Sequence, residues 1–132
     1  REKEKTGATG GTETLILVED EGALLNLVKK LLEKLGYTVL TATSPTLALE
    51  MARGYGEPIH LLITDVVMPE MSGRDLLNNF VQVRPGVKCL YMSGYTANVI
   101  AHHGILDEGV HFIQKPFSVE EMARKIREVL DS

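Results

Sequence analysis

The chain lacks several features that define whole classes of protein. It has one cysteine, Cys89, so no intramolecular disulfide can form, and this usage is compatible with a reducing compartment. Cys89 lies in an apolar run and is expected to be a small buried residue. No apolar stretch approaches the roughly 20 residues that span a bilayer, and no secretory signal pattern is present. We therefore expect no membrane contact by this chain and a cytoplasmic location.

An excess of positive charge is also missing. Lys and Arg total 14 against 18 Asp and Glu, so the formal net charge is −4 and no global basic field attracts nucleic acid. The histidines show no partner spacing for a zinc site; they are His60, His102, His103 and His111. There is no P-loop and no kinase-type ATP-binding segment. We expect no direct nucleic-acid binding and no self-phosphorylation from ATP.

What the chain does contain is a regular alternation of short apolar runs and amphipathic stretches. Strands are expected at 15–18, 37–42, 59–64, 87–92 and 110–114. Helices are expected at 23–35, 45–53, 74–83 and 98–106, and a capping-box pattern at 118–121 opens a last one. Strands that alternate with helices imply parallel crossovers, so the pattern predicts an α/β, doubly wound sheet.

The ends of the chain suggest its organisation. Residues 1–12 are charged and then rich in Gly and Thr, which predicts a flexible linker or an added tail, whereas 13–132 fits one domain. The chain starts at Arg1 rather than Met and has no output domain, so we expect a piece of a larger protein.

Four polar residues each lie just beyond an apolar run. They are Asp20, Asp65, Ser93 and Lys115. If the runs are parallel strands, these side chains meet at the carboxyl edge of one sheet, where open α/β sheets bind ligands. Each residue type is also common in turns and helix caps, but two carboxylates, a hydroxyl and an ammonium together favour a site for a divalent cation and a phosphoryl group.

Short motifs in a fixed order connect these residues to a known family. They are VEDE at 18–21, TDVVMP at 64–69 with Gly73 after it, MSG at 92–94 and QKPF at 114–117. Together they resemble the response-regulator receiver domain of two-component signalling, from about residue 13 to the C-terminus. The resemblance implies a flavodoxin-like, five-stranded parallel sheet of order 2-1-3-4-5 with five helices. The lead-in GTET and the segment MSGY look like receivers of hybrid sensor histidine kinases, with a stand-alone regulator as the alternative.

The resemblance implies a role for each residue at the predicted edge. Asp65 is the expected phosphoacceptor and nucleophile. Lys115 is expected to pair with Asp65 and then with the phosphoryl oxygens, and Ser93 is expected to donate a hydrogen bond to the same group. The family pattern also implies a cis bond between Lys115 and Pro116 and a switch made by Ser93 and Phe112.

Magnesium is the expected cofactor, because Mg²⁺ prefers octahedral oxygen coordination. Its expected ligands are Asp20, Asp65 and the backbone carbonyl of Val67, with Glu19 acting directly or through water. Three adjacent carboxylates at 19–21 repel one another, and a bound cation relieves that cost.

The expected partner is a histidine kinase or a histidine phosphotransfer domain, which supplies the phosphoryl group. A weak dimer through the fourth helix, fifth strand and last helix is also expected. Two competing classes remain open. One is a pseudo-receiver that binds proteins without phosphorylation. The other is a flavodoxin-like cofactor binder, although the acidic residues at 19–21 would repel its phosphate unless a cation intervened.

Overall fold

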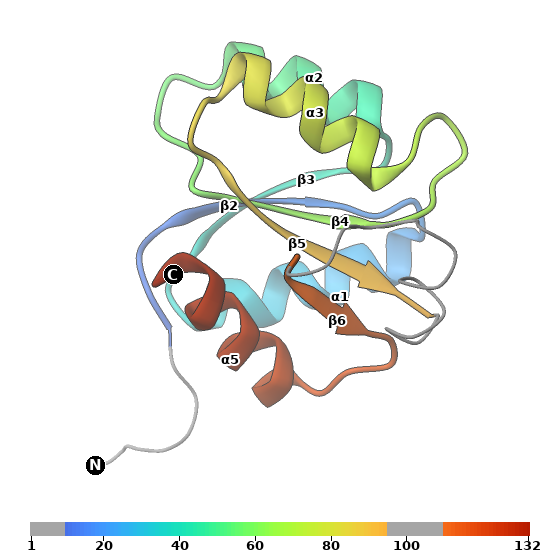
Figure 1. Cartoon of the computed structure of the whole chain (residues 1–132). Coiled ribbons are helices and arrows are strands. Elements are labelled where there is room, and N and C mark those ends of the chain that lie inside the picture. The colour runs from blue at the N-terminus through green and yellow to red at the C-terminus, as the bar shows by residue number, and fades with distance from the viewer. Residues whose placement is uncertain (1–9, 95–109) are drawn as a thin grey trace.

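A computed structural model describes residues 10–94 and 110–132 of the chain. A parallel sheet lies between two layers of helices (Figure 1). The elements in chain order are β2 (Thr14–Val18), α1 (Gly22–Lys34), β3 (Thr38–Ala42), α2 (Pro45–Gly54), β4 (Leu61–Asp65), α3 (Gly73–Val83), β5 (Lys88–Ser93), β6 (Phe112–Gln114) and α5 (Val119–Leu130).

The five strands lie in the order β3-β2-β4-β5-β6, and every neighbouring pair is parallel. In chain order this is 2-1-3-4-5, which confirms the predicted fold class. The register aligns the carboxyl ends of the strands, because Val18 pairs with Thr64, Asp65 with Met92 and Ser93 with Gln114. The residues that end or follow these strands therefore share one edge.

The two helix layers cover opposite faces of the sheet (Figure 1). β2 and β4 are buried along their whole length, as expected of central parallel strands. Their alternate side chains divide between two cores: Leu15 and Ile63 pack with α1 and α5, whereas Ile16 and Leu62 pack with α2 and α3. Burying each such side chain contributes about 1.5–3 kcal/mol, so the sheet is a firm base for its edge.

Local sequence signals explain where two of the helices begin. The Ser44 side chain accepts a hydrogen bond from the Leu47 amide, and Pro45 stands at the first turn of α2. In α5, Ser118 and Glu121 form the predicted capping box.

Some expectations need correction or lie beyond the described residues. Asp65 and Ser93 are the last residues of β4 and β5 rather than the first residues beyond them, and the last strand is limited to 112–114. Cys89 is half-buried instead of buried, because it lies near the start of β5, where burial is incomplete. Burial nevertheless raises the pKa of its thiol to about 12. The helix expected at 98–106 lies outside the described residues, within which there are four helices.

Part of the lead-in to β2 contacts the domain. The amide of Gly11 donates to the carbonyl of Leu35, and Arg127 of α5 donates to the carbonyl of Gly10. The same guanidinium binds both carboxylate oxygens of Glu13, at 3.1 and 2.6 Å. The boundary at residue 12 stays a prediction. Among the described helices, none is long and apolar enough to cross a membrane.

Candidate functional site

A cavity of about 430 Å³ opens at the carboxyl edge of the sheet. Its lining comes from the ends of β2, β4 and β5 and from the segment after β6. The lining residues are Glu19, Asp20, Glu21, Asp65, Val67, Met92, Ser93, Gly94 and Lys115. The structure therefore brings together the residues that the sequence placed at this edge, including the four polar ones.

Lys115 lies between two carboxylates. Its Nζ is 2.7 Å from Glu19 Oε1 and 2.7 Å from Asp65 Oδ1. The Lys115 amide also donates to the Ser93 carbonyl at 2.7 Å, which ties the end of β6 to the end of β5. The Lys115–Pro116 peptide bond is cis. The ion pair itself shows that the ammonium contacts the Asp65 carboxylate, the predicted partner.

Glu19 is a structural surprise. Its side chain is only 3% exposed, and its second oxygen accepts the Glu21 amide at 3.1 Å. Burial acts to raise the pKa of Glu19, but the hydrogen bonds from Lys115 and the Glu21 amide outweigh it and lower the pKa overall. Glu19 is therefore a buried, charged partner of Lys115, a contact that the sequence analysis did not anticipate.

The pKa of Asp65 shifts in the opposite direction from that of Glu19. The Asp65 side chain is 10% exposed, and burial raises its pKa to about 7, aided by the neighbouring Glu19 carboxylate and opposed by Lys115. Burial lowers the pKa of Lys115, yet its two carboxylate partners raise it overall. One ammonium thus serves two carboxylates, and the site has an excess of negative charge that a cation would neutralise.

The acidic residues offer ligands for such a cation. Oxygen atoms of Glu19, Asp20 and Asp65 lie within 4.8 Å of one another. Asp20 is exposed and lines the cavity. Val67, which is 64% exposed, lines the same cavity. An all-oxygen set with an open side fits Mg²⁺, which usually keeps several waters.

The two predicted switch residues lie on neighbouring strands. Ser93 is buried at the end of β5 and lines the cavity. Phe112 begins β6, is half-buried, and packs against a small cluster containing Val66 and Tyr91. Because Val66 directly follows Asp65, the ring of Phe112 is connected to the site by side-chain packing.

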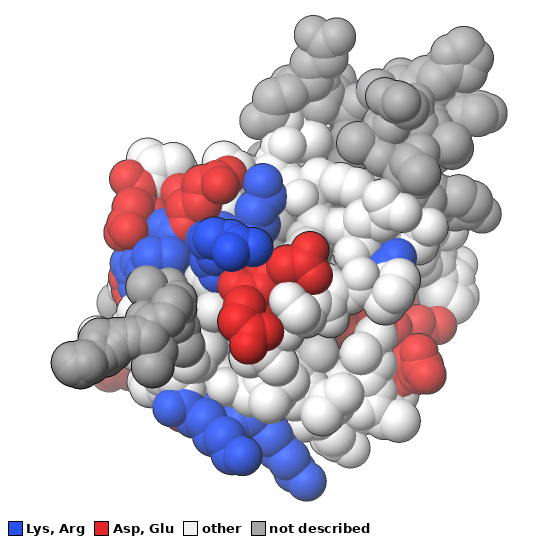
Figure 2. Space-filling model, turned by 90° about the horizontal axis from the view of Figure 1, so that it is seen from below, with Lys and Arg blue, Asp and Glu red and all other residues white. Residues whose placement is uncertain are grey.

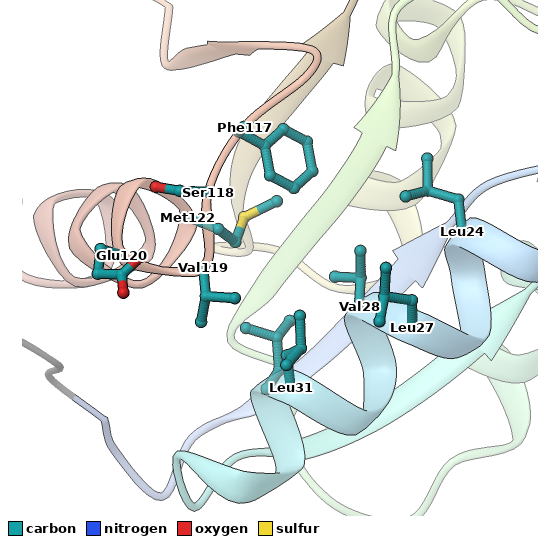
Figure 3. Close-up of a pocket in the computed structure, with 10 residues that line it drawn as sticks. Leu24, Leu27, Val28, Leu31, Phe117, Ser118, Val119, Glu120 and Met122 are labelled. Atoms are coloured by element: carbon teal, nitrogen blue, oxygen red, sulfur yellow. The ribbon is translucent and has the colours of Figure 1, made fainter.

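An apolar groove of about 390 Å³ lies between α1 and the start of α5. Figure 3 shows Leu24, Val28 and Leu31 on α1 across from Phe117, Val119 and Met122. Leu27, which also lines the groove, is 56% exposed. Figure 2 shows this side of the molecule with charges of both signs gathered beside an uncharged area, so no single sign dominates it. Sequence periodicity predicted the helix at 23–35 but did not show that part of its apolar side stays open.

An open parallel α/β sheet with an acidic pocket and one lysine at its carboxyl edge defines a narrow class of ligand-binding domains. The family model described as the response regulator receiver domain matches residues 15–127. The chain belongs to the response-regulator receiver family of two-component systems.

Individual relatives agree with this assignment. The chain is 36% identical over 128 residues to the sensor kinase CckA of Brucella abortus, covering 97% of the chain but 14% of that protein. It is 30% identical to the response regulator receiver protein CpdR of the same organism, covering 88% of the chain and 95% of CpdR. The crystal structure of the receiver domain from the hybrid histidine kinase CckA superimposes with a TM-score of 0.74 at 31% identity, covering 89% of this chain and 98% of that one.

Proposed function

We propose that this receiver accepts a phosphoryl group on Asp65 from a phosphohistidine. The observation that carries the proposal is the position of Asp65, whose backbone ends a buried strand while its carboxylate lies in an open cavity, 2.7 Å from Lys115. In the transfer, a carboxylate oxygen attacks phosphorus and the bond from phosphorus to the imidazole nitrogen breaks. The imidazole keeps that electron pair, and the product is an acyl phosphate on Asp65.

The chain's own residues supply orientation and charge. Lys115 holds the Asp65 carboxylate before transfer and can follow the charge onto the phosphoryl oxygens afterwards. Ser93, which ends the adjacent strand and lines the same cavity, would donate a hydrogen bond to one of those oxygens. Catalysis in such a site rests on positioning and electrostatic stabilisation.

Mg²⁺ is the proposed cofactor. Asp20, Asp65 and the Val67 carbonyl would hold it, with Glu19 acting directly or through water. When bound, the cation neutralises negative charge on the phosphoryl group and the carboxylates. Without it, the carboxylates share a single ammonium, so we propose that phosphoryl transfer depends on the metal.

The proposed donor is a protein, either a histidine kinase or a histidine phosphotransfer domain. The apolar groove supports this choice because residues that line it lie close along the chain to residues that line the cavity: Phe117 follows Lys115 by two residues, and Leu24 follows Asp20 by four. A small phosphodonor would not need an exposed leucine surface beside the site. A cytoplasmic location is proposed to match such a donor. A weak dimer through the fourth helix, fifth strand and last helix stays a prediction, and the fourth helix expected there lies outside the described residues.

A pseudo-receiver is the alternative function. It would use the same surface to bind a protein without taking a phosphoryl group. The intact set of Asp65, Lys115 and acidic neighbours favours the phosphoacceptor, since a pure binding module has no need of a lysine between two buried carboxylates.

Intact-mass measurement tests the proposal. After incubation with acetyl phosphate and Mg²⁺, the parent chain should gain one phosphoryl group, and Asp65→Asn should gain none. A chelator should abolish the gain in the parent. An unmodified parent would favour the pseudo-receiver, and an equally labelled Asp65→Asn protein would reject Asp65 as the acceptor.

A further inference from the structure

Gly73, the first residue of α3, lies against the backbone of the phosphoacceptor. A Cβ atom built at Gly73 would be 2.3 Å from the carbonyl oxygen of Asp65 and 3.2 Å from its carbonyl carbon. It would also lie 3.2 Å from the Cγ2 atom of Thr64. The nearest obstacle is a backbone atom at the end of a buried strand, which cannot turn aside as a flexible side chain would.

Glycine is needed at position 73 because of the small space available, not because of the backbone conformation. Among the described residues, only Gly36 and Gly86 have positive φ angles, so Gly73 adopts a conformation open to any residue. The α3 N-terminus approaches Asp65 so closely that no side chain fits between them.

Gly73 also closes the loop that leaves Asp65. Its amide donates to the Val66 carbonyl at 2.7 Å, while the Val66 amide donates to the Met92 carbonyl of β5 at 2.9 Å. Val66 is thus held on one side by α3 and on the other by the sheet. The next residue is Val67, whose carbonyl is a proposed metal ligand, so the same contact holds the backbone that leads into that carbonyl.

We propose that Gly73 is a positioning residue for the metal and phosphoryl site: its missing side chain lets α3 set the backbone of Asp65 and Val67. The inference rests on the proposed function. Mg²⁺ demands near-ideal octahedral geometry at about 2.0–2.1 Å, and sites work only when their groups are held within about 0.5 Å. A methyl group at Gly73 has to move either α3 or the Asp65 backbone, and both moves displace the proposed ligands.

The chain offers a matched control, Gly22. It is the first residue of α1, as Gly73 is of α3, and a Cβ at Gly22 meets nothing within 4 Å. Alanine at either position gains the same helix propensity. The two substitutions therefore differ chiefly in the contact with Asp65.

Mg²⁺ affinity of the full chain, measured by amide NMR titration, separates the two variants. We expect Gly73→Ala to weaken Mg²⁺ binding by about tenfold or more, as losses of supporting contacts around metal ligands do, whereas Gly22→Ala stays within about twofold of the parent. Ile126→Val, a core change in α5 far along the chain from both glycines, controls for general loss of stability and should also keep the parent affinity. Equal affinities in Gly73→Ala and Gly22→Ala would overturn the inference.

A measurement on the unaltered chain covers the case in which Gly73→Ala does not fold. The Gly73 amide should shift with added Mg²⁺ and saturate together with the signals of Asp65 and Val67, while the Gly54 amide, at the end of α2, should not. A Gly73 amide unmoved at saturating Mg²⁺ would contradict the inference. A parent chain that binds no Mg²⁺ would instead reject the proposed function, so the two failures are distinguishable.

Discussion

Lys115 shows how much of the site depends on single side chains. Its ammonium contacts two carboxylates whose pKa values shift in opposite directions, downward for Glu19 and upward for Asp65. Burial is the largest influence on both carboxylates. Besides its contact with Lys115, Glu19 accepts a hydrogen bond from the Glu21 amide, and this favours its charged form. The carboxylate whose charged form is less favoured is Asp65, the proposed phosphoacceptor.

At the residue scale, we predict that Mg²⁺ binding depends more on Asp20 than on Glu19. Asp20 is exposed and lines the cavity. In the part of the chain that the structure describes, Lys115 forms its ion pairs with Glu19 and Asp65, so the Oε1 atom of Glu19 is engaged by that lysine. Titration of Asp20→Ala and Glu19→Ala with Mg²⁺ measures the difference. We expect a loss of about tenfold or more for Asp20→Ala and a smaller loss for Glu19→Ala. The reverse order would exchange their roles.

Part of this site could be predicted from the sequence, and both the predicted part and the missed part have physical reasons. Asp65 and Ser93 end strands whose continuous apolar runs are readable without a structure, and parallel strands bring their ends together. The Glu19–Lys115 contact was missed because it joins residues 96 positions apart, and a glutamate after an apolar run also fits a solvated turn. Gly73 was read only as part of a motif, since its approach to the Asp65 carbonyl depends on how α3 packs.

At the scale of elements, Arg127 connects the last helix to the lead-in of the first strand. Arg127 binds Glu13 through two oxygens and also bonds Asp131 and the Tyr37 hydroxyl. The hydrogen bonds from Arg127 lower the pKa of Glu13 from 4.5 to about 2. A carboxylate with a lowered folded-state pKa stabilises the fold above its unfolded pKa, and that contribution disappears as the pH falls through the folded value.

Glu13→Gln should therefore destabilise the domain in a pH-dependent way. Because the pair is about a quarter exposed, solvent screening limits the loss to about 1 kcal/mol at pH 7. The difference between parent and variant should shrink as the pH falls from about 4.5 toward 2. Urea unfolding at several pH values measures it. A difference that stays constant over this range would show that Glu13 acts through packing rather than charge.

The groove between α1 and α5 gives a second prediction at this scale. Leu27→Asp places a charge on its exposed apolar lining and should slow transfer from a phosphohistidine protein by about tenfold, since truncating or charging a central interface residue often costs 1–2 kcal/mol or more. Transfer from acetyl phosphate should be unchanged. Leu47→Asp on α2, also an exposed leucine, is the matched control. Equal slowing in both variants would reject the groove as the donor's contact.

The elements themselves were largely predictable, although their order was not. Continuous apolar runs predicted β2 and β4, and the serine caps predicted the starts of α2 and α5. Periodicity cannot order strands within a sheet, and 2-1-3-4-5 followed only from the family resemblance. The length of β6 was overestimated because Val110 and His111, which precede it, continue the run, although the His111 carbonyl still accepts the Tyr91 amide.

At the scale of the whole molecule, phosphorylation of Asp65 is predicted to alter the face around β6 and α5. A phosphoryl group adds charge and acceptor oxygens, and Ser93 is placed to follow them. Phe112 packs against the cluster of Val66 and Tyr91, and Val66 follows Asp65, the proposed phosphoacceptor, so packing connects the ring to the change. Because Phe112 has no hydroxyl, its inward position would rest on apolar packing alone. A two-state element biased by a local contact is a recognised switch.

NMR with and without beryllofluoride, which mimics the phosphoryl group, tests this switch. Signals of the Phe112 ring and the neighbouring residues of β6 should shift. Phe80, which is fully buried in α3 on the other core, serves as the reference ring and should not. Shifts confined to the loops around Asp20 and Asp65 would reject the switch and favour a domain that only relays phosphate.

The most direct measurement of the central claim locates the phosphoryl group on the chain. Borohydride reduces an acyl phosphate to an alcohol, so a phosphorylated aspartate becomes homoserine and is identified by peptide mass spectrometry. After treatment with a phosphohistidine donor and Mg²⁺, the account predicts homoserine at position 65 and nowhere else. Homoserine at position 20, or no reduced residue in a chain that still binds its donor, would contradict it.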